Sequence, residues 1–401
     1  MQGFFRRTEL NQVQAPELLL PQCGLCKLYK GCQSPKMQPT GNNQRGVMII
    51  GEAPGRYEDL EGRQFVGETG TLLRTVLREI GVSMRKDCVL TNALACRPKD
   101  NVIPKPAMVD YCRPNVINAI KEYNPHVIIL LGSKAIKSVI GRYWHDNKVG
   151  GPKRWAGFQI PSISLNAWVC PTFHPSFVNR QTRDAGLYRM VFKRHLEAAF
   201  AYQERPWVEV PDYKSMVNLL YSPEAVREVV DRLVERGRPV AIDLETDRLK
   251  PEHSESTVLA ASIAWSTTKA VAFPIVRETA NELRRLVKAL PIIAHNAKFE
   301  VRWLRRYFKV RPLKVERCTM ISAHVLDCRS NTTSLKFQAT VNFGQEDYNS
   351  HLEDELKSRE KGGNAPNNIR YVDKKSLLTY CGLDALLTYK LHKLQEKEMK
   401  L

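Results

Sequence analysis

The chain alternates short apolar runs with longer amphipathic segments. Three apolar runs have strand character: VMII at 47–50, HVIILLG at 126–132 and VAIDLET at 240–246. In 69–81 and 222–237, apolar positions recur every three or four residues, which predicts amphipathic helices. Strands that alternate with such helices are typical of α/β domains.

The pattern is interrupted once near the middle of the chain. The segment RPWVEVPDYKS at 205–215 contains two prolines and follows a long helical stretch. A chain of 401 residues also exceeds the usual size of a single hydrophobic core. We therefore expect two domains, 1–206 and 207–401.

Charge narrows the possible partners. The chain has 61 Lys and Arg against 42 Asp and Glu, a formal net charge of +19 at pH 7. A polyanion would bind such a surface and release its counterions, so DNA is the first expected partner, although the same charges also suit a simply solvated surface. No apolar run is long enough to span a membrane and no apolar signal core begins the chain, so we expect no membrane partner and a cytoplasmic location. In that reducing compartment, clustered members of the ten cysteines indicate a metal or cluster rather than disulfides.

The first half contains five short motifs. In chain order they are GEAPG at 51–55, GRQFVG at 62–67, TN at 91–92 four residues before a cysteine, LGSKA at 131–135 and HPS at 174–176. The first follows a strand and opens a helix, a geometry that exposes backbone N–H groups to a ligand, but it lacks the P-loop pattern. The set resembles the family 4 uracil-DNA glycosylases over about residues 20–200. That resemblance implies a three-layer α/β/α domain with a central parallel sheet.

The resemblance also implies roles for individual residues. Uracil excision requires that the base be extruded, stacked and read, and that the negative charge developing on it be stabilised. By resemblance Phe65 stacks the base, Asn92 reads its edge and His174 donates to the departing uracil oxygen. The small residues Gly51 and Ala53 would let the base approach the backbone.

Two carboxylates are the expected partners of water or of an oxocarbenium-like sugar. They are Glu52 and Glu58, on and just beyond the GEAPG turn. Other uracil glycosylases have an Asp at the position that Ala53 occupies here. The assignment of Glu58 therefore depends on its place near the turn and not on a match to the family.

Four cysteines match the family's ligand pattern for a [4Fe-4S] cluster. Cys23 and Cys26 form a Cys-x-x-Cys pair, and Cys96 and Cys112 have fifteen residues between them. Four thiolates are what such a cluster requires, and we expect its role to be structural. A zinc site would use the same four ligands. Cys32 is outside the pattern and is expected not to be a ligand.

The second half begins with paired carboxylates. In VAIDLET, Asp243 and Glu245 share one face of a strand because alternate side chains point the same way. Two acidic groups on an apolar strand are costly unless a cation binds them, and a divalent metal is the natural compensation.

Two later motifs complete the pattern. HNAKFE at 295–300 supplies Glu300, and YCGLD at 380–384 places Tyr380 and Asp384 on one helix face. The order resembles the DEDD-type 3′-5′ exonuclease domain of family A DNA polymerases over about 207–401, which implies a ribonuclease H-like α/β domain with a mixed sheet. Glu300 replaces the family's usual Asp.

The resemblance implies a two-metal phosphodiesterase. Four carboxylates would hold two Mg²⁺ or Mn²⁺ ions. Tyr380 would orient the attacking water, while Asn296 and Lys298 would contact the DNA backbone. The expected metal ligands are Asp243, Glu245, Glu300 and Asp384.

Together the two halves predict a DNA repair or replication protein that excises uracil and trims 3′ ends. The chain ends where a family A polymerase domain would begin, so it is expected to be part of such a polymerase or an accessory to one. Two alternatives remain: a first half that only binds or scans DNA for the nuclease, and a purely structural scaffold for a polymerase.

Overall fold

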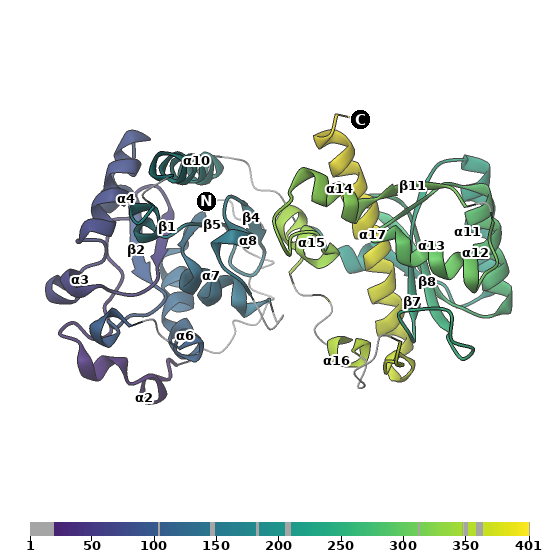
Figure 1. Cartoon of the computed structure of the whole chain (residues 1–401), viewed down its shortest axis with the longest axis horizontal. Helices are drawn as coiled ribbons and strands as arrows, with labels where there is room; N and C mark the ends of the chain where they lie inside the picture. Colours follow the sequence, from purple (N-terminus) through teal and green to yellow (C-terminus); the bar gives the residue numbers. More distant parts are fainter. Residues whose placement is uncertain are drawn as a thin grey trace. The chain divides into compact units, whose positions relative to one another are not determined.

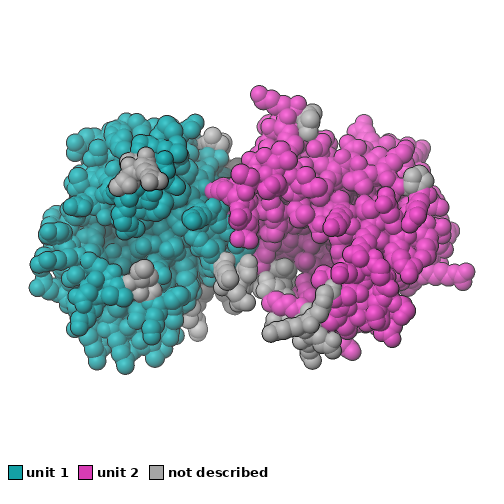
Figure 2. Space-filling model, viewed as in Figure 1, with its two compact units in different colours: residues 1–210, 340–346 teal, residues 211–339, 347–401 magenta. Residues whose placement is uncertain are grey.

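The computed structural model forms two compact units (Figure 2). The first comprises residues 1–210 with 340–346, and the second comprises 211–339 with 347–401. The structure describes residues 20–102, 105–144, 149–181, 184–204, 210–311, 313–346, 348, 352–357 and 364–400. The expected boundary between residues 206 and 207 lies outside the described residues.

The first unit has a five-stranded sheet in the order β2-β1-β3-β5-β4 (Figure 1). Neighbouring strands are parallel, except that β4 runs antiparallel to β5. The four parallel strands therefore end at one edge of the sheet. The strands are β1 Val47–Gly51, β2 Cys88–Asn92, β3 Val127–Leu131, β4 Ile160–Ser162 and β5 Ala167–Thr172.

Helices cover both faces of this sheet, which gives three layers. Alternate strand residues such as Val47 and Ile49 pack against α4 and α10, and the next residues in register, such as Met48, are equally buried on the other face. The helices are α2 Cys23–Cys26, α3 Arg56–Glu61, α4 Glu68–Glu79, α5 Met84–Asp87, α6 Pro106–Tyr123, α7 Ser133–Val139, α8 Pro152–Trp155, α9 Pro175–Asn179 and α10 Ala185–Gln203.

The second unit has a six-stranded mixed sheet in the order β11-β10-β7-β8-β9-β6. The hairpins β7-β8 and β8-β9 are antiparallel, and the remaining neighbours are parallel. The strands are β6 Val217–Leu219, β7 Val240–Thr246, β8 Val258–Ser266, β9 Lys269–Pro274, β10 Ile292–Ala294 and β11 Val315–Cys318.

The two faces of β7 differ. Ile242 and Leu244 join the apolar core under α11 and α12, whereas Asp243 faces Cys381 of α17. The pleat thus places the acidic positions together on the α17 side. The helices are α11 Pro223–Arg236, α12 Arg277–Ala289, α13 Ala297–Arg306, α14 Thr319–Leu326, α15 Leu335–Phe343, α16 Glu353–Leu356 and α17 Lys374–Glu398.

Local sequence signals account for these elements. In α11, the Ser222 hydroxyl accepts from Ala225 N at 3.2 Å, Pro223 opens the helix, and Gly237 ends it with φ 64°. The strands expected at 47–50, 126–132 and 240–246 are confirmed as β1, β3 and β7, and the helices expected at 69–81 and 222–237 as α4 and α11. The predicted pair of α/β domains is confirmed as well. Among the described residues, no helix combines the length and apolarity needed to cross a membrane.

Candidate functional sites

Four cysteines from three separate segments line one hollow of the first unit. Cys23 and Cys26 begin and end α2, Cys96 follows β2, and Cys112 lies in α6. The hollow that they line has a volume of ≈ 330 Å³. The structure therefore brings the predicted ligand set together from positions almost ninety residues apart.

The surroundings of these sulfurs fit a metal-bound group. Lys36 N donates to Cys96 Sγ at 3.2 Å, and Ala95 N and Asn115 Nδ2 each donate to Cys112 Sγ at 3.4 Å. N–H donors favour the thiolate, which is the form that binds metal. Without a cation, burial raises the pKa of Cys96 to about 12, so the thiol would stay protonated.

Cys32 does not line the hollow, and its Sγ donates to the carbonyl oxygens of Leu28 and Tyr29 at 3.7 and 3.6 Å. Its side chain also contacts Cys96 and contributes, after burial, to the raised pKa of that thiol. Its expected place outside the ligand set stays a prediction.

A larger hollow, of ≈ 1550 Å³, opens where β1, β2, β3 and β5 end. The carboxyl edge of a parallel sheet is where α/β proteins bind their ligands. It brings together most of the residues predicted to bind and excise uracil. Its lining includes Glu52, Ala53, Glu58, Phe65, Asn92 and His174.

Asn92 and Phe65 meet over Gly51, the last residue of β1. A Cβ atom on Gly51 would lie 2.3 Å from Asn92 Oδ1 and 2.9 Å from Phe65 Cζ, so only glycine fits. Asn92 Nδ2 is buried and has no hydrogen-bond partner within the described structure. An unpaired buried donor costs roughly 1–3 kcal/mol, a cost that a ligand oxygen would remove.

Glu58 fixes the backbone beneath this pair. Its two carboxylate oxygens accept from Gly55 N and Phe65 N, each at 2.5 Å. Phe65 has φ 56°, a left-handed conformation that a bulky residue rarely adopts without support. Burial raises the pKa of Glu58, and these two N–H groups oppose the rise. The contacts suit a residue that positions Phe65, and the catalytic role expected of Glu58 stays a prediction.

His174 is held in one tautomer. It precedes α9, and its Nδ1 lies 2.7 Å from Ser176 Oγ and 3.3 Å from Ser176 N. The backbone N–H can only donate, so we assign Nδ1 as the acceptor of both contacts and the proton of the neutral ring to Nε2. Burial lowers the pKa of His174, while the charge of Glu52 opposes that effect.

Glu52 is anchored at the start of α7. Its Oε1 accepts from Ser133 Oγ and from Lys134 N, both at 3.0 Å. Gly132 makes room for this carboxylate, since a Cβ there would lie 2.6 Å from Oε1. Glu52 thus lies beside His174 with one oxygen already occupied by the protein.

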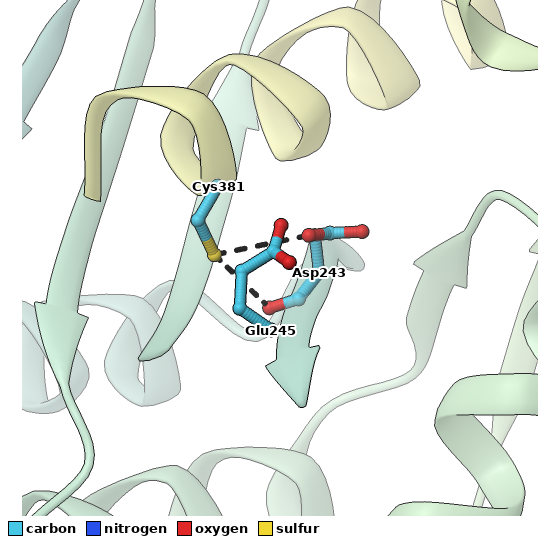
Figure 3. Close-up of side chains that lie close together, drawn as sticks. All are labelled: Asp243, Glu245 and Cys381. Atoms are coloured by element: carbon cyan, nitrogen blue, oxygen red, sulfur yellow. Dashed lines mark hydrogen bonds between the residues drawn. The ribbon is translucent and has the colours of Figure 1, made fainter. Parts of the chain in front are cut away.

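In the second unit, Asp243 and Glu245 of β7 meet Cys381 of α17 (Figure 3). Their potential ligand atoms lie within 4.8 Å of one another. Cys381 Sγ donates to the carbonyl oxygen and to Oδ2 of Asp243, each at 3.7 Å. Burial raises the pKa of Cys381 well above its usual value, so it remains a thiol that orients Asp243.

The buried carboxylates are costly to ionise unless a cation binds them. Glu300 is 2% exposed, and its Oε2 has no hydrogen-bond partner among the described residues. Burial, and then repulsion between the carboxylates, raises the pKa values of Asp243, Glu245 and Glu300 well above their usual range. Oxygen-rich sites of this kind suit Mg²⁺ or Mn²⁺ and do not favour softer metals.

Asp384 has a partner that sequence reasoning missed. Tyr348 Oη donates to Asp384 Oδ1 at 2.7 Å, and the rings of Tyr348 and Tyr380 lie 6.0 Å apart. Burial raises the pKa of Asp384 to about 6, against the hydrogen bonds from both tyrosines. The four-residue spacing identified Tyr380, but Tyr348 precedes Asp384 by 36 residues and no motif includes it.

The two residues expected to bind DNA lie at the start of α13. Asn296 precedes the helix with φ 66°, and both Asn296 and Lys298 are exposed. Glu300 points inward from the same helix. Exposure near the carboxylates is compatible with the expected role, which stays a prediction.

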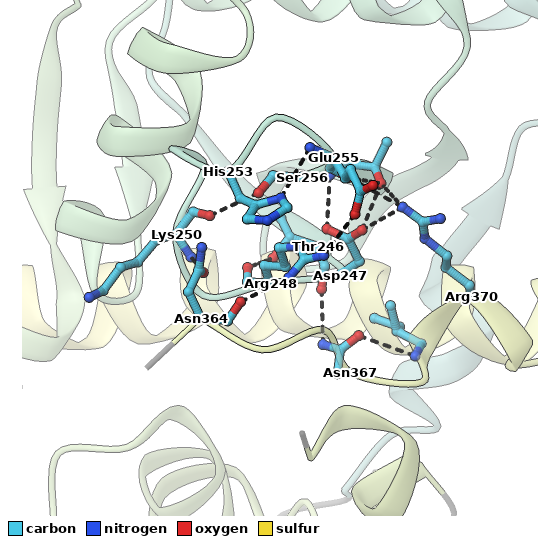
Figure 4. Close-up of polar contacts among 12 residues, drawn as sticks. Thr246, Asp247, Arg248, Lys250, His253, Glu255, Ser256, Asn364, Asn367 and Arg370 are labelled. Carbon is cyan, nitrogen blue, oxygen red and sulfur yellow. Dashed lines mark hydrogen bonds and ion pairs between the residues drawn. The ribbon is translucent and has the colours of Figure 1, made fainter. Parts of the chain in front are cut away.

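A polar network fixes the turn that follows β7 (Figure 4). Asp247 is buried and accepts from Thr257 N and Thr257 Oγ1 at 2.8 Å and from Arg370 at 2.6 Å. Asn367 Nδ2 donates to the carbonyl oxygen of Thr246 at 3.1 Å. Although Asp247 continues the D-x-E alternation, both of its oxygens are occupied, so it is structural and not a metal ligand.

Comparisons with known proteins divide the chain in the same way. Residues 38–201 match the uracil DNA glycosylase superfamily and residues 218–400 match a 3′-5′ exonuclease family. The type-4 uracil-DNA glycosylase of Pyrobaculum aerophilum is 37% identical over 172 residues, covering 41% of this chain and 82% of that protein. The enzyme of the same name from Saccharolobus solfataricus is 32% identical over 179 residues, covering 45% and 79%.

A third relative extends across both halves. A DNA polymerase of Bacillus phage SP01 is 24% identical over 330 residues, covering 74% of this chain and 34% of the polymerase. The chain thus spans about a third of that polymerase.

The two domains are those of a DNA-repair enzyme, a uracil-DNA glycosylase followed by a 3′-5′ exonuclease. Through its first half the chain belongs to the type-4 uracil-DNA glycosylase family. Both resemblances seen in the sequence are confirmed.

Proposed function

We propose that His174 and Asn92 excise uracil from DNA in the first half, and that the buried carboxylates of the second half trim 3′ ends. The observation that carries the first step is the tautomer of His174, whose Nδ1 accepts from Ser176 N. This leaves an Nε2–H donor in the hollow that Asn92 and Phe65 also line.

The residues of the hollow have complementary tasks. Phe65 stacks an extruded uracil, and the unpaired Asn92 Nδ2 donates to a carbonyl oxygen of the base. As the N-glycosidic bond breaks, negative charge moves onto the uracil oxygens, and His174 Nε2–H stabilises it. Glu52 supplies negative charge near the oxocarbenium-like sugar, and Gly51 and Ala53 leave room for the base.

In the second half, Asp243, Glu245, Glu300 and Asp384 would hold Mg²⁺ or Mn²⁺. When bound, the ions supply Lewis-acid stabilisation of charge at the scissile phosphate. Tyr348 favours the ionised form of Asp384 and orients it through its 2.7 Å hydrogen bond. Tyr380 would orient the attacking water. Asn296 and Lys298 contact the strand at the start of α13.

The four cysteines would hold a [4Fe-4S] cluster with a structural role. Support comes from the hollow that the four cysteines line together and from the N–H donors to Cys96 and Cys112. Ligands from α2, the segment after β2, and α6 would tie the start of the described chain to the strand that ends in Asn92.

We further propose that the chain works with a DNA polymerase. The similarity to the phage polymerase covers 74% of the chain, which is more than either family match alone. Both halves therefore have counterparts within a replication enzyme, and DNA near a growing 3′ end is the proposed substrate.

One incubation tests both activities. Purified protein is given single strands that contain uracil and are labelled at the 5′ or 3′ end, with and without EDTA. We expect EDTA-resistant abasic sites together with 3′ trimming that EDTA abolishes. His174→Gln should slow excision by about 10²- to 10⁴-fold while leaving trimming intact, and Asp243→Asn should do the reverse.

If the unmutated protein forms no abasic sites, catalysis in the first half is disproved. The alternative, a first half that only binds or scans DNA, is then supported. Trimming that survives in Asp243→Asn would show that the carboxylates do not form the nuclease site.

A further inference from the structure

The hollow of the first unit contains a second aromatic side chain besides Phe65. Tyr57 lies in the first turn of α3 and lines the same hollow as Phe65, Asn92 and His174. Tyr57 is 61% exposed, whereas Phe65 is only 2% exposed. The hollow thus has one buried ring and one ring that solvent reaches.

The position of Tyr57 relative to Phe65 is fixed by the backbone. Glu58, the next residue along α3, accepts from Gly55 N and from Phe65 N, each at 2.5 Å. Tyr57 Cδ2 lies 3.7 Å from the position that a Cβ atom on Gly67 would occupy, two residues after Phe65. The first turn of α3 is therefore tied to the loop that carries Phe65, and the spacing of the two rings does not depend on DNA.

The fold does not account for the place of the Tyr57 ring. A single exposed tyrosine is ordinary on a protein surface, so its exposure alone indicates nothing. The ring makes no aromatic or cation–π contact with any described residue. Asp59 anchors α3 instead: it is buried and accepts from Gln33 N and Ser34 N at 3.1 and 2.9 Å. The face of the ring is thus open to a ligand that enters the hollow.

The hollow has room for more than one base. Its volume of ≈ 1550 Å³ exceeds the roughly 300–1,000 Å³ of a pocket that holds one small ligand. A uracil stacked on Phe65 therefore leaves space for a second nucleotide. Three cations, Arg56, Lys134 and Arg180, also line the hollow, alongside the exposed acid Glu68. The phosphates on either side of a bound uracil would meet these cations.

We propose that Tyr57 stacks on the base next to the extruded uracil, so that the first half holds two consecutive nucleotides of a single strand. The inference rests on the proposed excision of uracil and deepens it by defining the substrate. Aromatic side chains hold successive bases of single strands whatever the sequence, because every base has a π face. In a duplex the neighbouring base is already paired and stacked, so this contact favours single strands.

The test removes the ring and the base in turn. Tyr57→Ala is compared with the unmutated protein on three single strands that each contain one uracil: a complete strand, and two in which the nucleotide on the 5′ or the 3′ side of the uracil lacks its base. On the complete strand the variant should lose about 5- to 150-fold in kcat/KM, the usual effect of one base–aromatic stack. On one of the two strands with a missing base, the unmutated protein should lose the same factor and the variant should lose nothing more.

Two further variants separate stacking from a structural role. Tyr57→Phe keeps the ring and should retain the full rate on every strand. Tyr221→Ala removes a tyrosine of similar exposure, 56%, from the second unit and should leave excision unchanged. The unfolding midpoint of Tyr57→Ala should match that of the unmutated protein, because the ring that it removes is largely exposed.

An equal loss for Tyr57→Ala on all three strands would overturn the proposal. A loss confined to duplex DNA would also overturn it, since Tyr57 would then act as a wedge in the gap left by the uracil. If the unmutated protein forms no abasic sites, the proposed excision fails, and the affinities for the three strands decide on the stacking. Affinities that Tyr57→Ala leaves unchanged, or lowers equally for all three strands, reject it.

Discussion

At the scale of single residues, the hollow proposed to bind uracil depends on the absence of a Cβ atom at Gly51. Gly51 lets Asn92 and Phe65 approach each other over the end of β1, because a Cβ there would lie 2.3 Å from Asn92 Oδ1. Glu58 adds to this by holding Phe65 in its left-handed conformation through a 2.5 Å hydrogen bond. The geometry of the pocket is thus fixed by contacts that involve no substrate.

Gly51→Ala should therefore slow uracil excision at least 10-fold. The added methyl group displaces Asn92 or Phe65, and crowding of this kind also costs about 1–3 kcal/mol of stability. Single-turnover excision and chemical unfolding would measure the two effects.

The matched control is Gly186→Ala, where an added Cβ meets nothing within 4 Å on the exposed side of α10. It should keep full activity. An active Gly51→Ala protein would show that Asn92 and Phe65 need not meet as they do here.

At the scale of elements, the proposed nuclease site depends on how the turn after β7 is fixed. Asp247 is 2% exposed in its side chain and pairs with Arg370 at 2.6 Å, while Asn367 holds the carbonyl of Thr246. This network ties the end of β7 to the segment that leads into α17. The two elements that supply Asp243, Glu245 and Asp384 are joined through it.

Arg370→Gln should lower the free energy of unfolding of the second unit by about 1–3 kcal/mol, because it leaves a buried carboxylate short of a donor. Trimming should fall as β7 loses its support. Arg285→Gln removes an exposed guanidinium that pairs with Asp231 and with Glu282, and Arg227 still pairs with Glu282, so its effect should stay below about 1 kcal/mol.

Urea unfolding of both variants, followed in the second transition, measures the difference. Equal losses in the two variants would mean that the Asp247 network does not stabilise the turn.

At the scale of the whole molecule, the net positive charge attracts DNA, whereas the buried negative charges of the second unit repel one another. The +19 surface favours DNA, while the second unit encloses four carboxylates that repel one another. Burial raises the pKa values of Asp243, Glu245 and Glu300, and raises the pKa of Asp384 to about 6. The metal-free fold therefore binds more protons than the unfolded chain does.

Because the folded chain binds more protons than the unfolded chain, the stability of the second unit should fall as pH rises. Raised folded-state pKa values give stability that is present below pH 4 and is lost as pH rises through those values, with the share of Asp384 lost by about pH 6. In EDTA, the unfolding temperature of the second unit should fall between pH 5 and pH 8. Mg²⁺ at a hundred times its Kd should raise the free energy of unfolding by roughly 3 kcal/mol. At a fixed Mg²⁺ concentration the gain should be larger at higher pH, because protons then compete less for the carboxylates.

Scanning calorimetry with and without Mg²⁺ measures the effect, and Asp243→Asn should weaken it. A Mg²⁺ effect that declined as pH rose would contradict the assignment of these carboxylates as a metal site.

The sequence by itself determined whatever depends on spacing along one element. Asp243 and Glu245 share a strand face, and Tyr380 and Asp384 share a helix face, because the periods of 2 and 3.6 residues are properties of the backbone. The apolar runs likewise predicted β1, β3 and β7, and the order of motifs identified both domain families.

The tertiary structure alone decided which distant residues meet. Tyr348 reaches Asp384, Glu58 holds Phe65, and Arg370 reaches Asp247 across 123 residues. These contacts result from the way helices and turns pack on the two sheets, and no local period encodes that packing.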